Sequence, residues 1–281
     1  MIRKAISVLL VTALFTPFQS SASIFKSFSD EQLELIADEI EASILPSTTN
    51  ALNTSDSSEV SFLEIAATDE YSKFDFKKWN AVNYNLFLMA FKGYLVMKND
   101  AMISKSQYLT IINFEMSSNL KRMWVLDMKN HKIVFHDLVS HGRNSGEEFA
   151  TSFSNAHESY KSSLGFYVTG IPYMGKNDYS LRLHGVEEGF NDNAFDRGIV
   201  MHAAEYVCNS YICSNKRLGR SQGCPAVSPK INKQVINTIQ GGSCLFIYYP
   251  DKKYLKVSGI INAKNPSKEY LQSSEYALNL P

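Results

Sequence analysis

The segment with the clearest chemical character is the turn around Cys224, which reads Gly-Arg-Ser-Gln-Gly-Cys-Pro-Ala over residues 219–226. A buried structural cysteine is the alternative, but such a residue has apolar neighbours, so this composition favours an exposed nucleophilic thiol. Gly223 lets the backbone approach a reacting carbon closely, and the charge of Arg220 favours thiolate over thiol. Because a proline without an N–H follows the cysteine, an oxyanion would be bound by the amides of Gly223 and Cys224 or by the Ser221 side chain.

A cysteine nucleophile needs a base, and the chain contains six histidines, all of which precede Cys224. In papain-like proteases the histidine follows the cysteine, so this order argues against that class. The best placed histidine is His202, because it ends the apolar run Gly198–Met201 and would be held rigidly at the end of a buried strand, facing a cleft. A packed structural histidine is the alternative that spacing alone leaves open.

Several segments upstream of the cysteine belong to one pattern together with its turn. They are Leu138–Gly146, Phe153–Asn155, Ser162–Tyr167, Gly189–Ala194, Ile199–His202 and Gly219–Ala226. Together these segments resemble the murein L,D-transpeptidase catalytic-domain family, a branch of the YkuD-type enzymes. The resemblance covers roughly residues 80–250 and implies the β-sandwich or barrel-like YkuD fold.

The family motif resembles the sequence around the proposed nucleophile and base. In YkuD-type enzymes an upstream histidine is followed by a Ser/Thr-His-Gly-Cys motif that holds the nucleophile. His202 and Cys224 stand at those two positions, and Ser221 and Gly223 match the motif's hydroxyl residue and its glycine. The resemblance implies that Cys224 attacks, that His202 is its base and that the carbonyl of Ala203 orients the base.

The implied chemistry is acyl transfer through a thioester on peptidoglycan stem peptides. Cys224 would attack the carbonyl of the third stem residue, a diamino acid, and D-Ala would leave. A side-chain amine of a second stem would resolve the acyl-enzyme and form a 3→3 cross-link, whereas water would make the protein an L,D-carboxypeptidase. Attachment or release of a wall protein through the same acyl-enzyme is a further alternative. The chemistry implies no cofactor and no metal.

One position departs from the family motif. Gln222 stands where most YkuD-type enzymes have the second histidine of the motif, so an uncharged amide replaces that imidazole. The glutamine form followed by Pro-Ala is typical of this branch. A non-catalytic wall-binding protein is the alternative in which Gln222 marks a decayed site, but the presence of both His202 and Cys224 argues against it.

Candidate substrate contacts are polar residues near the motif segments. Planar guanidinium groups suit the carboxylates of a diaminopimelate-containing stem, and hydroxyl groups suit the lining of a groove. The candidates are Arg220, Arg143, Arg197, His141, Tyr160, Ser162 and Ser163. An ordinary surface charge or turn hydroxyl is the alternative for each of them.

The N-terminus predicts a compartment independently of the motif. Residues 1–22 have the charged, apolar and small-residue parts of a secretory signal peptide, and the apolar run is too short to span a bilayer. No other stretch is long and apolar enough to be transmembrane, so we expect a soluble mature protein in the periplasm or at the cell wall. The 28 basic and 28 acidic residues balance, and nothing suggests binding to nucleic acid.

The other cysteines have structural interpretations. In an oxidising compartment Cys208 and Cys213 could form a disulfide, provided that the backbone brings them within reach. Cys244 is typical of a small buried residue at the start of a strand. A zinc site from Cys208, Cys213 and Cys224 lacks a Cys-x-x-Cys pair, so no metal site is predicted.

The elements that must position these residues follow from hydrophobic periodicity. We expect a signal peptide at 1–22, an N-terminal helical segment and polar linker at 23–79, a catalytic domain at 80–255 and a C-terminal tail at 256–281. Helices are predicted at 29–44, 84–97 and 230–239, a polar linker at 47–58, and strands at 109–114, 123–127, 132–136 and 245–249. The predicted fold is mainly β, with peripheral and N-terminal α-helices.

Overall fold

The computed structural model describes residues 55–76 and 81–263. The predicted signal peptide, the predicted helix at 29–44 and most of the predicted C-terminal tail lie outside these ranges. Within the described part of the chain, no helix is both long enough and apolar enough to cross a membrane.

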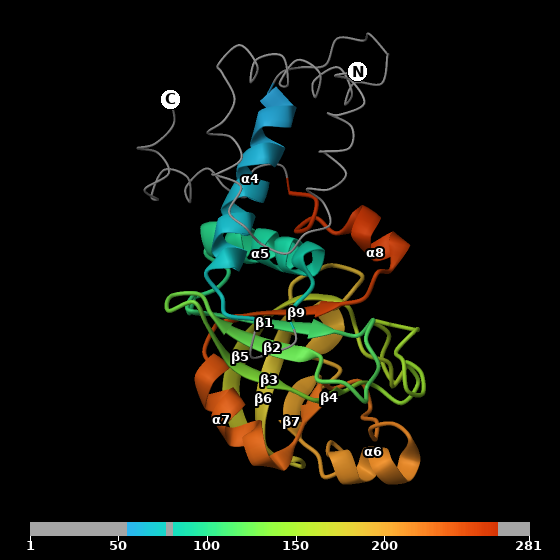
Figure 1. Ribbon diagram of the computed structural model, residues 1–281. Coiled ribbons are helices and arrows are strands. Elements are labelled where there is room, and N and C mark those ends of the chain that lie inside the picture. The colour runs from blue at the N-terminus through green and yellow to red at the C-terminus, as the bar shows by residue number, and fades with distance from the viewer. Residues whose placement is uncertain (1–54, 77–80, 264–281) are drawn as a thin grey trace, which may run out of the picture. The chain divides into compact units, whose positions relative to one another are not determined.

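A single nine-stranded sheet forms the body of the described chain, in the order β3-β2-β1-β9-β5-β6-β7-β8-β4 (Figure 1). The strands are β1 (Tyr108–Asn113), β2 (Met123–Asp127), β3 (Lys132–Asp137), β4 (Val139–Ser140), β5 (Gly165–Gly175), β6 (Asp178–Gly185), β7 (Val200–Ala203), β8 (Ala226–Val227) and β9 (Cys244–Tyr248). The two outermost strands are β3 and β4, which follow each other directly in the chain. The sheet therefore curls until it is nearly closed, and the predicted mainly β, barrel-like fold is confirmed.

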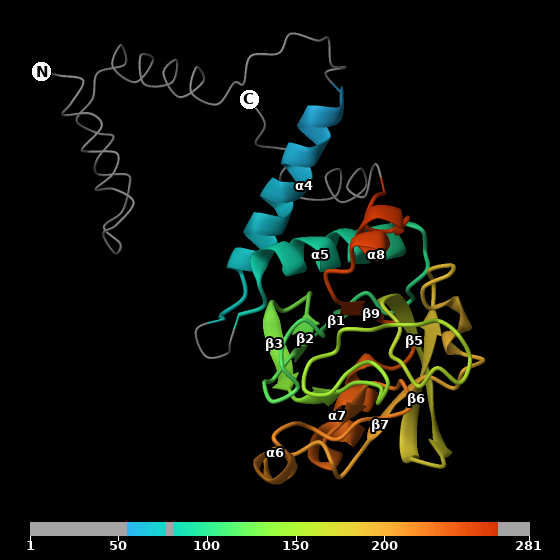
Figure 2. The ribbon, with the colours of Figure 1, turned by 90° about the vertical axis from the view of Figure 1, so that its right-hand side faces the viewer.

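Helices cover both sides of this sheet. They are α4 (Ser55–Ser72), α5 (Tyr84–Asn99), α6 (Asn209–Asn215), α7 (Pro229–Ile239) and α8 (Lys252–Val257), with a 3-10 turn η1 at Asp192–Ala194. Helix α5 contacts β1 and β9, while α7 contacts β1, β6 and β7 from the opposite side, as Figure 2 shows. Asn83 caps the start of α5, and Ser228 followed by a proline begins α7.

The four predicted strands are present within one residue as β1, β2, β3 and β9, and the predicted helices at 84–97 and 230–239 are present as α5 and α7. The predicted polar linker at 47–58 is wrong at its C-terminal end, because α4 begins at Ser55. The C-terminal end of α4 packs on α5, with the rings of Tyr71 and Phe87 5.1 Å apart. The first residues of α4 are polar and rich in serine, so the sequence did not predict this helix. Its later residues are held by tertiary packing.

The contact between α5 and the sheet depends on a residue without a side chain. The ring of Phe166 is fully buried, stacks on Phe246 at a centroid distance of 4.1 Å and points at Gly93 of α5. A Cβ on Gly93 would lie 2.0 Å from the end of that ring. Because the ring is fixed by its own stacking, it has no room to withdraw.

A second buried feature is a polar pair formed by the residue before β2 and the residue after β4. Arg122 is fully buried, lies over the ring of Phe114 and donates to the carbonyl oxygens of Met116 and Val139. Its Nη2 lies 2.8 Å from Nδ1 of His141, which is itself only 1% exposed. The prediction that His141 lines the cleft is therefore wrong: its side chain is an acceptor for a buried guanidinium.

The environment of His141 keeps its ring neutral. Burial, with the nearby charge of Arg122 as a second cause, lowers its pKa to about 3. In the unfolded chain the pKa of a histidine is about 6.5, so the folded state resists protonation that the unfolded state accepts. The contribution of His141 to stability is therefore fully present above about pH 6.5 and is lost as the pH falls towards 3.

We predict that Gly93→Ala lowers stability. Overpacking against Phe166 costs about 1–3 kcal/mol, which exceeds the roughly 1 kcal/mol that alanine contributes to a helix. Urea unfolding measures the effect as a lower midpoint. Gly259→Ala is the matched control, because a Cβ there meets nothing within 4 Å. An unchanged midpoint for Gly93→Ala would contradict the proposed tight junction.

We predict that His141→Gln makes stability less dependent on pH. Glutamine cannot be protonated in this range but retains an acceptor for Arg122. Between pH 7.5 and 4.5 the unaltered protein should lose about 2–3 kcal/mol more unfolding free energy than the variant. Urea titrations of both proteins at the two pH values test this, and other titrating groups cancel in the comparison. Equal losses would show that His141 is not buried as a neutral acceptor.

Candidate active site

The predicted base lies on strand β7, and the predicted nucleophile lies in the turn that leads into the neighbouring strand β8. Strands β7 and β8 are parallel, and His202 of β7 is paired in register with Ala226 of β8, two residues after Cys224. The sulfur of Cys224 lies 3.5 Å from the amide nitrogen of Val200 and 3.7 Å from the carbonyl oxygen of Gly198. The thiol therefore lies against the start of the strand that carries the imidazole.

His202 has the orientation of a base. Its Nδ1 lies 2.8 Å from the carbonyl oxygen of Ala203, so Nδ1 carries the proton and donates, which leaves the lone pair on Nε2. The residue is 6% exposed, and burial lowers the pKa of its ring. At neutral pH the imidazole is therefore in the neutral form that can accept a proton.

Cys224 is more buried than its neighbours in the sequence suggested. It is 9% exposed, and burial raises the pKa of its thiol, although the charge of Arg197 acts in the opposite direction. The prediction of an exposed thiol activated by Arg220 is wrong on both points, because the thiol is buried and the cation that acts on it is Arg197. The free site therefore pairs a neutral thiol with a neutral imidazole.

Ser221 holds together the turn of residues 219–226 that carries Cys224, which we call the nucleophile turn after its predicted role. Its hydroxyl donates to the carbonyl oxygen of Cys224 at 2.6 Å and accepts from the amide of Gly223 at 3.0 Å. Two of the three predicted oxyanion donors, the Ser221 hydroxyl and the Gly223 amide, are thus already bonded within the turn. The amide of Cys224 is the predicted donor that remains. The side chain of Gln222 is exposed.

Segments distant in sequence support this turn from outside. Gly223 has φ +122°, and a Cβ there would lie 2.8 Å from the carbonyl oxygen of Lys161. The Ser162 hydroxyl donates to the Gly223 carbonyl at 3.0 Å and accepts from the amide of Gly142 at 3.0 Å. The amide of Ser221 also donates to the carbonyl of His141. The predicted glycine is therefore required both by its conformation and by the close approach of a second backbone.

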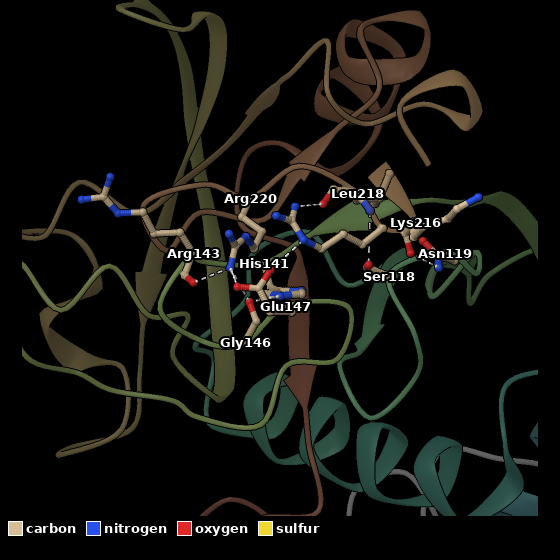
Figure 3. A network of polar contacts seen from close by, with 10 residues as sticks. Ser118, Asn119, His141, Arg143, Gly146, Glu147, Lys216, Leu218 and Arg220 are labelled. Carbon is tan, nitrogen blue, oxygen red and sulfur yellow. Dashed lines mark hydrogen bonds and ion pairs between the residues drawn. The ribbon is translucent and has the colours of Figure 1, made fainter. Parts of the chain in front are cut away.

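The three candidate arginines have different surroundings. Arg220 forms an ion pair with Glu147 at 2.6 Å and donates to the carbonyl oxygens of Arg143 and Gly146 (Figure 3). Glu147 in turn pairs with Arg217 at 2.8 Å. Arg220 therefore shares one carboxylate with Arg217, and its guanidinium holds the 143–147 segment in place.

Arg197 does not present a free fork to a substrate. Its two terminal nitrogens donate four hydrogen bonds within the 154–163 segment. One acceptor is the Ser163 hydroxyl, which is buried and itself donates to the Ser154 carbonyl. The predictions of Arg197 as a substrate fork and of Ser163 as a groove hydroxyl are therefore wrong: both groups are committed to the protein itself.

Arg143 differs from the other two arginines. Its guanidinium lies 4.0 Å from the centre of the Tyr160 ring, and Figure 3 shows its side chain extending away from Glu147. Among the residues that the structure describes, no carboxylate lies within ion-pair distance of it. Its backbone amide donates to the carbonyl of Ser221, which fixes it beside the nucleophile turn. Tyr160 has φ +53°, an uncommon conformation for an aromatic residue. Substrate contact by Arg143 and Tyr160 stays a prediction.

A tyrosine near the thiol was missed by the sequence analysis. Tyr206 is half-buried, and a Cβ on Gly219 would lie 2.3 Å from its side chain. Burial raises the pKa of its phenol. Its ring therefore packs between the segment after the base and the segment before the nucleophile. Its position four residues after His202 was the only available signal.

The remaining cysteines are not bonded to one another. All four are free thiols, and the prediction of a disulfide between Cys208 and Cys213 is not what the structure shows. Helix α6 begins directly after Cys208, whose sulfur lies 3.1 Å from the hydroxyl of Ser210, while Cys213 lies within the helix. Cys244 is fully buried at the start of β9, as predicted. Across the described ranges, no group of three or more metal-ligating side chains could hold an ion.

The chain was compared with curated proteins, with solved structures and with the sequence patterns of protein families. No curated protein matches it. Solved structures similar to the chain include an L,D-transpeptidase from Mycobacterium smegmatis (10% identity, 51% of this chain, 59% of that chain, TM-score 0.32). L,D-transpeptidase 3 from Mycobacterium tuberculosis is 12% identical, with 51% of this chain and 61% of that chain covered and a TM-score of 0.32. An L,D-transpeptidase from Stackebrandtia nassauensis is 13% identical, with 73% of this chain and 97% of that chain covered and a TM-score of 0.32. The chain thus spans about 59% of the length of the first of these. The pattern of the L,D-transpeptidase catalytic domain matches residues 78–248, more than half of the chain, so the protein belongs to this family.

Proposed function

We propose that this protein is a secreted peptidoglycan L,D-transpeptidase with Cys224 as nucleophile and His202 as base. The observation that supports this most directly is the register of β7 and β8, which sets His202 opposite Ala226, two residues after Cys224, in a member of the family. The contact of His202 Nδ1 with the Ala203 carbonyl supports the assignment of the base. Residues 1–22 would direct export, which the mass of the exported chain tests, and residues 80–255 would form the catalytic domain.

The acylation step begins from two neutral groups. Nε2 of His202 takes the proton of the thiol as Sγ of Cys224 attacks the carbonyl carbon of the third stem residue. The carbonyl oxygen becomes an oxyanion, for which the Cys224 amide is the available donor. When the tetrahedral intermediate collapses, the bond to D-Ala breaks, the imidazolium gives its proton to the leaving amine, and a thioester remains on Cys224.

The deacylation step decides between the alternative functions. In a transpeptidase, a side-chain amine of a second stem attacks the thioester, His202 accepts a proton from that amine, and the Cys224 thiol is restored. Water in place of the amine would make the protein a carboxypeptidase. A wall protein as the attacking group would make it an attachment enzyme, and a wall protein as the leaving group would make it a release enzyme. The same acyl-enzyme serves all three, so only the products distinguish them.

We predict that the mature protein converts disaccharide-tetrapeptide into a cross-linked dimer that has lost one D-Ala. Cys224→Ala should abolish this product because no thioester can form, whereas Cys213→Ala, which removes an exposed thiol of α6, should leave it unchanged. Mass spectrometry of the products is the measurement. Tripeptide alone would identify a carboxypeptidase, and full dimer formation by Cys224→Ala would overturn the mechanism.

We predict that Cys224 and His202 react as a neutral pair. Burial lowers the pKa of His202, so kcat/KM should rise with pH through a midpoint below about 6.5 as the imidazole loses its proton. Burial raises the pKa of Cys224, so its alkylation by iodoacetamide should reach its midpoint only above about pH 8.5. Peptide mass analysis of Cys224 measures alkylation, with glutathione as the reference thiol. Full alkylation rates already at pH 6–7 would instead indicate a preformed thiolate–imidazolium pair.

A further inference from the structure

Arg197 is a half-buried cation without an acidic partner. Its Nη1 donates to the carbonyl of Ser154 at 2.9 Å and to the hydroxyl of Ser163, and its Nη2 donates to the Ser159 hydroxyl at 3.2 Å and to the Lys161 carbonyl at 2.7 Å. All four acceptors are neutral. Within the part of the chain that is described, no carboxylate lies within 4 Å of this guanidinium, so its hydrogen bonds are satisfied while its charge is not balanced.

The segment that Arg197 holds lies directly against the nucleophile turn. The carbonyl oxygen of Lys161 would be 2.8 Å from a Cβ on Gly223, and Nη2 of Arg197 would be 3.5 Å from the same point. The Ser162 hydroxyl donates to the carbonyl of Gly223. One guanidinium thus fixes the backbone that Gly223 touches and itself lies beside the residue that precedes Cys224.

Arg197 is also joined to the thiol through its own backbone. The next residue, Gly198, presents its carbonyl oxygen 3.7 Å from the sulfur of Cys224. The charge of Arg197 lowers the pKa of the thiol against the larger effect of burial, and reciprocally the thiolate favours the protonated guanidinium, whose pKa burial lowers. A cation that lacks a carboxylate counterion is available to stabilise an anion that forms next to it.

We propose that Arg197 is a positioning residue of this site, which both locks the 159–163 segment against the nucleophile turn and supplies the positive charge that the Cys224 thiolate faces during reaction. The proposal rests on Cys224 being the nucleophile. It replaces the motif's second histidine, here Gln222, with a cation from another part of the chain. It assigns no substrate contact to Arg197, because its terminal N–H groups are already used.

Alkylation of Cys224 by iodoacetamide tests this without any substrate. The reagent is uncharged, and the reaction forms an S–C bond and releases iodide, so its rate follows the thiolate fraction. In Arg197→Gln the midpoint of the pH–rate profile should rise by about one pH unit. At a fixed pH below the midpoint, a rise of this size lowers the thiolate fraction, and with it the alkylation rate, about tenfold. Arg197→Lys should keep the midpoint, because it keeps the charge.

A second substitution separates charge from packing in a chain that retains Arg197. Ser159→Asp places a carboxylate at an existing acceptor of Nη2, so the fork stays anchored while its charge is compensated. The midpoint of the pH–rate profile for Cys224 alkylation should rise as it does in Arg197→Gln. Ser159→Asn has nearly the same shape without the charge and should leave the midpoint unchanged. Arg182→Gln is the control for loss of a different arginine, which lies over the rings of Tyr173 and Phe195 and is not among the charges that act on Cys224.

The results distinguish a positioning role from a purely structural one. A role in packing alone predicts altered rates but an unchanged midpoint in Arg197→Gln and Ser159→Asp, and that outcome would overturn the proposal. If Arg197→Gln does not fold, the two substitutions at Ser159 test the proposal. Equal midpoints in Ser159→Asp and Ser159→Asn would overturn it, and a higher midpoint in Ser159→Asp alone would support it. Because alkylation needs neither stem peptide nor acceptor, a failure here is distinguishable from a failure of the proposed transpeptidase activity, which the product assay measures separately.

Discussion

The double hydrogen bond of the Ser221 hydroxyl is the constraint on which the site depends. It accepts from the Gly223 amide and donates to the Cys224 carbonyl, so the residues on both sides of Gln222 are held in one closed turn. That closure directs the Gly223 carbonyl at the Ser162 hydroxyl. The serine of the motif is thus an internal brace, which leaves little hydrogen-bonding capacity for an oxyanion.

The curl of the sheet brings the partners to this turn. Strand β4 pairs with β8, and β8 pairs with β7, so the segment after β4, the turn before β8 and the histidine on β7 come to neighbouring positions. The chain from Gly142 onward then crosses the turn and returns as the 154–163 segment that Arg197 holds. Burial has opposite effects on the proposed nucleophile and base, since it raises the pKa of the thiol and lowers that of the imidazole. A nearby unbalanced cation therefore matters more here than at an exposed cysteine.

Residue types and local periodicity predicted a substantial part of this arrangement. The glycine before Cys224 and the position of His202 at a strand end are visible in the sequence, and the four apolar strand runs are present in the sheet. Strands β5 and β6 were not predicted, because Gly170 and Pro172 interrupt β5 where its register against β6 shifts. The short strands β4 and β8 carry too few residues for a periodic signal.

The roles of the arginines could not be predicted, because they depend on partners distant in sequence. Arg220 belongs to the motif, but it forms an ion pair with Glu147, which it shares with Arg217. Arg197 lies far from Cys224 along the chain, yet it is the cation whose charge reaches the thiol. His141 looks like a cleft residue beside a glycine and an arginine, and only the buried Arg122 explains why its ring points inward. Sequence spacing does not indicate which charges are balanced.

The central claim is that catalysis passes through a thioester on Cys224, and intact-protein mass spectrometry after rapid acid quenching tests it most directly. With a stem tetrapeptide as substrate, the account predicts a transient mass increase equal to the tripeptide acyl group. Digestion should place that group on the peptide that contains Cys224, and Cys224→Ser should not form this thioester. Formation of product with no adduct on Cys224, or an adduct on another residue, would contradict the account.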